Sequence, residues 1–131
     1  MIAVDTNVVV RLLVDDDPLQ SAKARRLFDE HADADGSLWL SDVVAVELSW
    51  VLARAYQRSR AEIVTALRAL AGHATVALES PQAMREAIAL FEQSKADFAD
   101  CLLSVKAGER ACDKLVTFDR KMRELPRVAL L

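Results

Sequence analysis

Residues 1–14 have the sequence MIAVDTNVVVRLLV, in which one apolar pattern gives way to another. Ile2–Val4 is a short apolar run typical of a strand, and in Thr6–Val14 the apolar residues recur at helical spacing. Asp5 stands between these two segments. The stretch therefore predicts a strand that leads directly into a helix, with an acidic side chain where the strand ends.

The rest of the chain continues this alternation. Further strands are predicted at Leu38–Leu40, Thr75–Leu78, Leu115–Thr117 and Val128–Leu130, and further helices at Gln20–Ala32, Asp42–Tyr56, Ser59–Leu70, Pro81–Ser94, Phe98–Arg110 and Arg120–Leu125. Strands that alternate with helices favour an α/β fold with a mainly parallel sheet and helices on both faces. In such folds, functional sites gather at the carboxyl ends of the strands.

Length and composition are those of one globular domain, which we expect to span residues 1–131. Apolar residues make up 53% of the chain, and only three glycines and three prolines occur, which argues against disorder. Cys101 and Cys112 are interpreted as reduced thiols, because two cysteines do not make a disulfide framework. Neither a signal peptide nor a membrane span is indicated, so we expect a cytoplasmic protein.

Charge is distributed unevenly along the chain. The formal net charge is −3, but the first 53 residues hold ten acidic and four basic residues, whereas the remainder holds ten and thirteen. Overall acidity argues against a protein that binds nucleic acid by charge alone. It does not exclude an enzyme that brings its own cations.

Two aspartates follow predicted strands. Asp5 follows the first strand and Asp119 follows Leu115–Thr117, so both are expected at the carboxyl edge of the sheet. For each of them, capping of the next helix is an equal alternative. Asp97 and Asp100 are three residues apart, a spacing that places both carboxylates on one helix face. Helix capping is the favoured interpretation for Asp97, and a functional role for Asp100.

Glu47 lies in the apolar segment VVAVELSWVL, residues 43–52. Because its neighbours one turn away are apolar, we expect this helix to be largely buried. A buried carboxylate is costly unless it has a partner. A salt bridge to Arg54 is one alternative, and a bound cation is the preferred one.

A divalent cation would relieve the repulsion among these carboxylates. Mg²⁺ and Mn²⁺ prefer oxygen ligands and retain waters and substrate phosphates in their coordination shell. Such ions activate water for phosphodiester cleavage, and they reverse the local sign of charge for a polyanionic substrate. Water is the expected nucleophile, since His31 and His73 are interpreted as surface residues.

Several segments together resemble a PIN domain, of the kind found in bacterial VapC toxins. They are Asp5-Thr6-Asn7, Glu47 within a Val-x-Glu-Leu helix, Asp97-Phe98-Ala99-Asp100, Val116-Thr117-Phe118-Asp119-Arg120 and the final LPRVALL. No single segment is specific, but the ordered set runs from Met1 to the last residue.

The resemblance implies a three-layer α/β/α sandwich with a central, mainly parallel five-stranded sheet. It implies a Mg²⁺- or Mn²⁺-dependent endoribonuclease that hydrolyses RNA with metal-activated water, forms homodimers and is blocked by a VapB-like antitoxin. The metal-binding and catalytic acids would be Asp5, Glu47, Asp100 and Asp119, with Asp97 as an additional metal-binding acid and Thr6, Asn7 and Thr117 as supporting polar residues.

Basic residues offer contacts for RNA phosphates. Arg120, Lys121 and Arg123 directly follow Asp119, and Arg54 belongs to a basic stretch for which a solvated helix face is an equal alternative. Three other functions stay open: a phosphoryl-transfer enzyme of another α/β family, a non-catalytic module that binds protein or RNA, and an RNA-processing PIN nuclease without an antitoxin.

Overall fold

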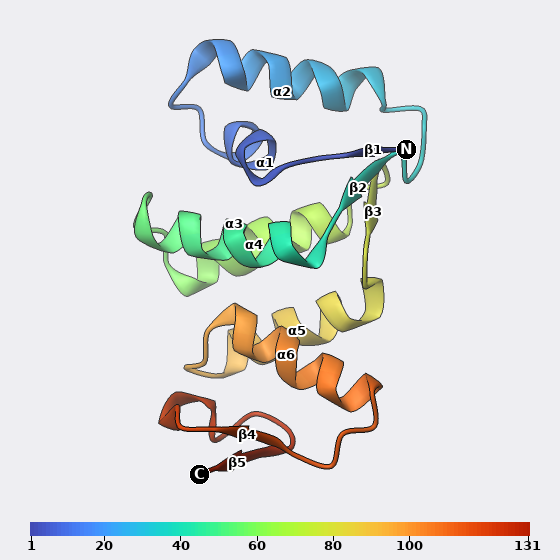
Figure 1. Cartoon of the computed structure of the whole chain (residues 1–131). Helices are drawn as coiled ribbons and strands as arrows, with labels where there is room; N and C mark the ends of the chain where they lie inside the picture. The colour runs from blue at the N-terminus through green and yellow to red at the C-terminus, as the bar shows by residue number, and fades with distance from the viewer. The chain divides into compact units, whose positions relative to one another are not determined.

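The structure is a computed structural model that describes all residues from 1 to 131. The chain forms two compact units, Met1–Pro81 and Gln82–Leu131. Figure 1 follows the elements from the blue N-terminus to the red C-terminus. Each unit contains parallel strands and helices, which confirms the predicted α/β class.

The first unit is built on a three-stranded parallel sheet in the order β1-β2-β3. Ile2 pairs with Leu38, and Leu38 pairs with Val76. The elements of this unit are β1 (Ile2–Ala3), α1 (Thr6–Leu13), α2 (Pro18–Glu30), β2 (Leu38–Leu40), α3 (Asp42–Arg54), α4 (Arg60–Ala71) and β3 (Val76–Leu78).

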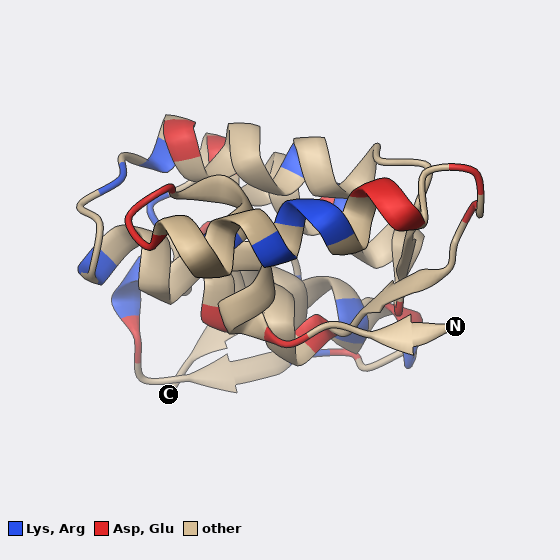
Figure 2. Cartoon of the chain, turned by 90° about the horizontal axis from the view of Figure 1, so that it is seen from above, with Lys and Arg blue, Asp and Glu red and all other residues tan.

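Local sequence sets where the helices of this unit begin. The Ser41 hydroxyl accepts a hydrogen bond from an amide in the first turn of α3, and Ser59 and Glu62 form a reciprocal capping box at α4. Helix α2 begins at Pro18 and carries lysine and arginine in its middle, with acidic residues at its end and in the loops before and after it (Figure 2). Val9, Leu38 and Leu48 are fully buried and form part of the core.

The second unit pairs two parallel strands, β4 (Leu115–Thr117) and β5 (Val128–Leu130). Its helices are α5 (Pro81–Gln93), α6 (Phe98–Glu109) and the 3₁₀ turn η1 (Arg120–Met122). Phe98 is fully buried, and its ring meets that of Phe91 edge to face with 5.8 Å between the centroids.

Helix α6 ends in a Schellman motif with alanine at the left-handed position. Ala111 has φ +57°, and the Cys112 amide donates to the Ala107 carbonyl at 2.9 Å. The Arg127 guanidinium lies against the last turn at Gly108, where a Cβ would fall 2.4 Å from the guanidinium carbon. Arg127 also donates to the Ser104 carbonyl at 3.4 Å, so the chain before β5 is held to the carboxyl end of α6.

Two expectations from the sequence need correction. The five strands form a three-stranded and a two-stranded sheet, in place of the single five-stranded sheet that was expected. Each strand has only two or three residues, so each ladder contains few hydrogen bonds. The helix expected at Arg120–Leu125 is a single 3₁₀ turn, because the chain turns toward β5 after Met122.

No helix of the structure has the length and apolar character that crossing a membrane requires. Neither cysteine forms a disulfide bond. Cys101 is buried in the second unit, and Cys112 is exposed.

Candidate active site

In the first unit, Asp5 stands where β1 passes into α1. It occupies the N-cap position with extended backbone geometry, φ −85° and ψ 161°, but its side chain makes no capping hydrogen bond. An N-cap aspartate ordinarily accepts a bond from the first turn. The exposed carboxylate of Asp5 is therefore left for another partner.

Glu47 on α3 is tied to the start of α1. The Thr6 hydroxyl donates a hydrogen bond to Glu47 Oε2 at 2.9 Å. Thr6 is only 4% exposed, so its hydroxyl is held in place by packing. The bond joins two residues far apart in sequence and brings Glu47 beside the helix that Asp5 begins.

The expected burial of Glu47 is wrong, because the residue is exposed. Helix α3 leaves one face uncovered, and Val43, one turn before Glu47, is 65% exposed. Arg54 forms no ion pair with Glu47. Its guanidinium lies over the Trp50 ring, 5.6 Å from the centroid.

The second unit gathers three further aspartates. Asp97 occupies the N-cap position of α6 without a side-chain capping bond, and Asp100 lies in the first turn of the same helix. Asp119 follows β4, and its carboxylate accepts a hydrogen bond from the Lys121 amide at 2.9 Å. The Asp119 amide donates to Thr117 Oγ1 at 3.0 Å, so Thr117 fixes the backbone that carries this acid.

The pKa of the Asp100 carboxyl is raised above its ordinary value. Burial is the largest cause, followed by the negative charges of Asp97 and Asp119, and a hydrogen bond from the Asp97 backbone opposes them. Asp97 and Asp119 are therefore close enough to Asp100 for their charges to act on it. A cation beside them would favour the ionised form of Asp100.

The candidate acids Asp5, Glu47, Asp97, Asp100 and Asp119 offer a divalent metal only oxygen ligands. Within neither unit do three His, Cys, Asp or Glu side chains stand ready to hold a metal ion. Mg²⁺ is commonly bound through one or two carboxylates, with waters and substrate phosphates completing its shell. An all-oxygen, carboxylate-rich donor set therefore fits Mg²⁺ or Mn²⁺, and zinc with its preference for nitrogen and sulfur fits it poorly.

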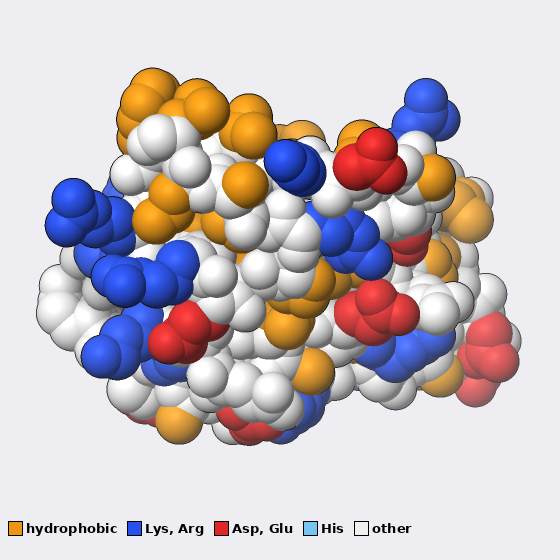
Figure 3. Space-filling model, turned by 90° about the horizontal axis from the view of Figure 1, so that it is seen from below, with side chains coloured by type: hydrophobic (Ala, Val, Ile, Leu, Met, Phe, Trp, Pro, Cys, Tyr) orange, Lys and Arg blue, Asp and Glu red, His pale blue; other side chains and the backbone are white.

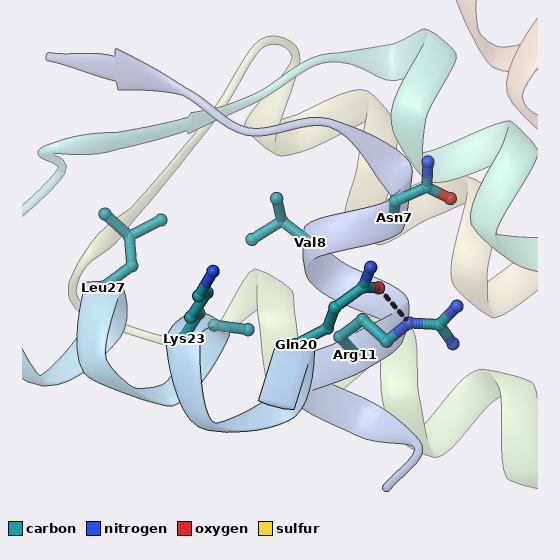
Figure 4. Close-up of a pocket in the computed structure, with 7 residues that line it drawn as sticks. Asn7, Val8, Arg11, Gln20, Lys23 and Leu27 are labelled. Carbon is teal, nitrogen blue, oxygen red and sulfur yellow. Dashed lines mark hydrogen bonds between the residues drawn. The ribbon is translucent and has the colours of Figure 1, made fainter. Parts of the chain in front are cut away.

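Asn7 lines a pocket of about 390 Å³ between α1 and α2. Figure 4 shows its side chain with those of Val8 and Arg11 from α1, opposite residues of α2. The pocket has apolar walls, and its polar rim includes Gln20, whose side-chain oxygen accepts a hydrogen bond from Arg11 Nε at 2.7 Å. Asn7 thus lines this pocket, and it lies within one helical turn of Asp5.

Two residues beside the acids were not singled out from the sequence. Phe118 is 81% exposed although it lies between Thr117 and Asp119, and an apolar residue after a strand gives no sign of that exposure. Lys95 lines a pocket together with Arg120, Lys121 and Arg123. It is distant from them along the chain, so only the fold brings it there.

Comparison with known proteins shows which chains this one is similar to. A VapC ribonuclease of Aquifex aeolicus (strain VF5) is 28% identical to the chain over 100 residues, which are 76% of this chain and 74% of that protein. The family model described as PIN domain matches residues 2–128. Since that match covers both units, the chain belongs to the PIN-domain family.

Proposed function

We propose that this protein is a metal-dependent endoribonuclease. In this proposal Asp5, Glu47, Asp100 and Asp119 bind Mg²⁺ or Mn²⁺, and Asp97 assists. The placement of the aspartates in the second unit carries the proposal: Asp97 and Asp100 lie at the start of α6 and Asp119 follows β4, and the charges of Asp97 and Asp119 act on Asp100, which gives a cation a reason to bind. The similarity to a VapC ribonuclease supports RNA as the substrate.

When bound, a divalent ion lowers the pKa of water and offsets negative charge on the reacting phosphate. The residues of the chain orient the acids. Thr6 fixes the direction of the Glu47 carboxylate, and Thr117 fixes the backbone of Asp119. The histidines are engaged elsewhere: His31 Nδ1 lies 2.9 Å from the Leu27 carbonyl oxygen, and His73 meets Phe28 edge to face. Water therefore remains the proposed nucleophile.

The exposed ring of Phe118 is suited to RNA because it directly precedes a proposed metal ligand. A nucleobase stacked on it would bring a neighbouring phosphate toward Asp119. Phe118→Ala is expected to raise the KM for RNA cleavage and to change kcat less. Arg54, which stacks on Trp50, is a second proposed RNA contact on the first unit.

We further propose that the protein is the toxin of a toxin–antitoxin pair and forms a homodimer. The pocket between α1 and α2 would suit a segment of a VapB-like antitoxin, because its apolar walls lie beside Asn7 and the start of α1. A segment seated there would block access to Asp5. An RNA-processing nuclease without an antitoxin is the alternative, and a neighbouring gene for a small DNA-binding protein would favour the toxin.

The test is cleavage of a structured RNA pool by purified protein with Mg²⁺ or Mn²⁺, and then with EDTA. Asp5→Ala should abolish metal-dependent cleavage, whereas Asp35→Ala, which removes another exposed aspartate of the first unit, should not. Cleavage that survives EDTA and Asp5→Ala would contradict the proposal. So would wild-type protein that neither cleaves RNA nor binds Mn²⁺ in calorimetry.

A further inference from the structure

Four basic side chains converge on one pocket of the second unit. Lys95, which precedes α6, lines a pocket of about 250 Å³ with Arg120, Lys121, Arg123 and Glu124. Figure 3 shows lysine and arginine side chains gathered at one end of the face that it views, with an acidic side chain among them. The pocket thus combines four cations with a single carboxylate.

The positive charge of this pocket is not offset by ion pairs. Lys95, Arg120, Lys121 and Arg123 are all exposed, and none of them forms a salt bridge with an acidic residue. Like charges held together repel one another, so an anion between them would be stabilised. Since Lys95 is distant in sequence from Arg120, Lys121 and Arg123, the fold brings it to the other three cations.

The backbone beneath the pocket is well anchored. Met122 and Leu125 are each only 4% exposed, and they hold the segment around η1 against the core of this unit. The Arg123 Nε donates to the Arg120 carbonyl at 3.2 Å, which orients its guanidinium and leaves the terminal nitrogens for a ligand. A guanidinium presented in this way suits an oxyanion with two acceptor oxygens.

Residues that line the pocket lie close in sequence to two of the proposed metal-binding acids. Lys95 precedes Asp97 by two residues, and Arg120 directly follows Asp119. Asp97 and Asp100 lie at the start of α6, directly after the segment that carries Lys95. At both places along the chain, a basic residue of the pocket therefore stands next to a proposed metal-binding acid.

We propose that this pocket binds a backbone phosphate of RNA that neighbours the phosphate being cleaved, with Lys95 as a contact that fixes the substrate's register. The inference rests on the proposed function. A polyanion would meet metal-bound acids at one phosphate and the four cations at the next. Lys95 contributes binding here and takes no part in bond breaking.

The test measures the affinity of the protein for a fluorescein-labelled RNA hairpin by fluorescence anisotropy. EDTA is present so that no cleavage occurs. For Lys95→Gln, the slope of log affinity against log salt should become shallower by about 0.7–0.9, the value for one lost phosphate contact. Lys95→Arg should restore the slope. Lys114→Gln, which neutralises an exposed lysine of the same unit outside the pocket, should leave it unchanged.

A wild-type slope in Lys95→Gln would overturn the proposal, whether or not the protein cleaves RNA. The same holds if Lys95→Gln leaves RNA binding intact and weakens binding of an acidic protein segment. Binding is measured without metal and does not depend on cleavage. A wild-type protein that fails to cleave RNA would therefore contradict the proposed nuclease activity, and RNA binding by the pocket could still be measured. With active protein, Lys95→Gln should raise KM and leave kcat near the wild-type value.

Discussion

The two units hold their acidic side chains by different means. In the first, Glu47 accepts a hydrogen bond from the buried hydroxyl of Thr6, a neutral donor. In the second, burial raises the pKa of Asp100, and the negative charges of Asp97 and Asp119 raise it further. The hydrogen bond in the first unit orients the Glu47 carboxylate and brings no further charge to it. The second unit places several negative charges near Asp100. A cation should therefore be most stabilising at the second unit, whereas the first depends on geometry.

The largest effect is expected when the crowded acid of the second unit is neutralised. Asp100→Asn should lower RNA cleavage more than about 100-fold, since even residues that only support metal ligands account for 10–100-fold. Mn²⁺ binding measured by calorimetry should weaken in parallel. Asp113→Asn, at an exposed aspartate of the same unit, is the matched control. Activity within a few fold of wild type in Asp100→Asn would remove the second unit from the proposed site.

A smaller effect is expected at the neutral contact of the first unit. Thr6→Val keeps the shape of the side chain and removes the hydroxyl that orients Glu47, so activity should fall about 10–100-fold with little change in folding. Thr6→Ser should recover most of it. As a control, Thr65→Val removes a hydroxyl that bonds only the Ala61 carbonyl. Equal activity in Thr6→Val and Thr65→Val would show that the contact is structural only.

The charge repulsion in the second unit should appear in the pH dependence of stability. Because the pKa of Asp100 is raised in the folded state, its contribution to stability is complete below the ordinary aspartate pKa and is lost as pH rises through the raised value. Asp97→Asn removes one cause of the shift, so the metal-free variant should lose less stability on going to neutral pH. Thermal unfolding in EDTA measures the pH dependence of stability, and an NMR titration of the Asp100 carboxyl measures its pKa. An unchanged Asp100 titration would contradict this prediction.

The smallest effects concern the backbone. Each unit has two residues with positive φ, and two of these four residues make a useful comparison: Gly36 at +64° in the first unit and Ala111 at +57° in the second. Gly36→Ala should destabilise the protein by about 1 kcal/mol, and Ala111→Gly should stabilise it by about as much or less. Chemical denaturation of the two variants measures both changes. Changes of the same sign in the free energy of unfolding of the two variants would contradict the interpretation that positive φ strains a residue other than glycine.

Short apolar runs were sufficient to predict β2, β4 and β5, whose bounds agree with the structure. Their identity as strands follows from local pattern alone. The division into two sheets could not be predicted in this way. Strand pairing depends on contacts between distant segments, which periodicity does not contain.

The interpretation of Glu47 shows a second limit of sequence analysis. This apolar helix was expected to be largely buried, yet α3 exposes Val43 and Glu47 together. Composition states how apolar a helix is, whereas its neighbours decide which face is covered. For the same reason, neither the partnership of Thr6 with Glu47 nor the position of Lys95 follows from spacing along the chain.

The contact between Arg127 and Gly108 predicts how these two positions change together in related sequences. Any side chain larger than hydrogen at 108 would displace the guanidinium and its bond to Ser104. Relatives that retain arginine at 127 are therefore expected to retain glycine at 108, and relatives with a larger residue at 108 should have lost the arginine. Independent variation at these positions across an alignment would show that the C-terminal strand is held in another way.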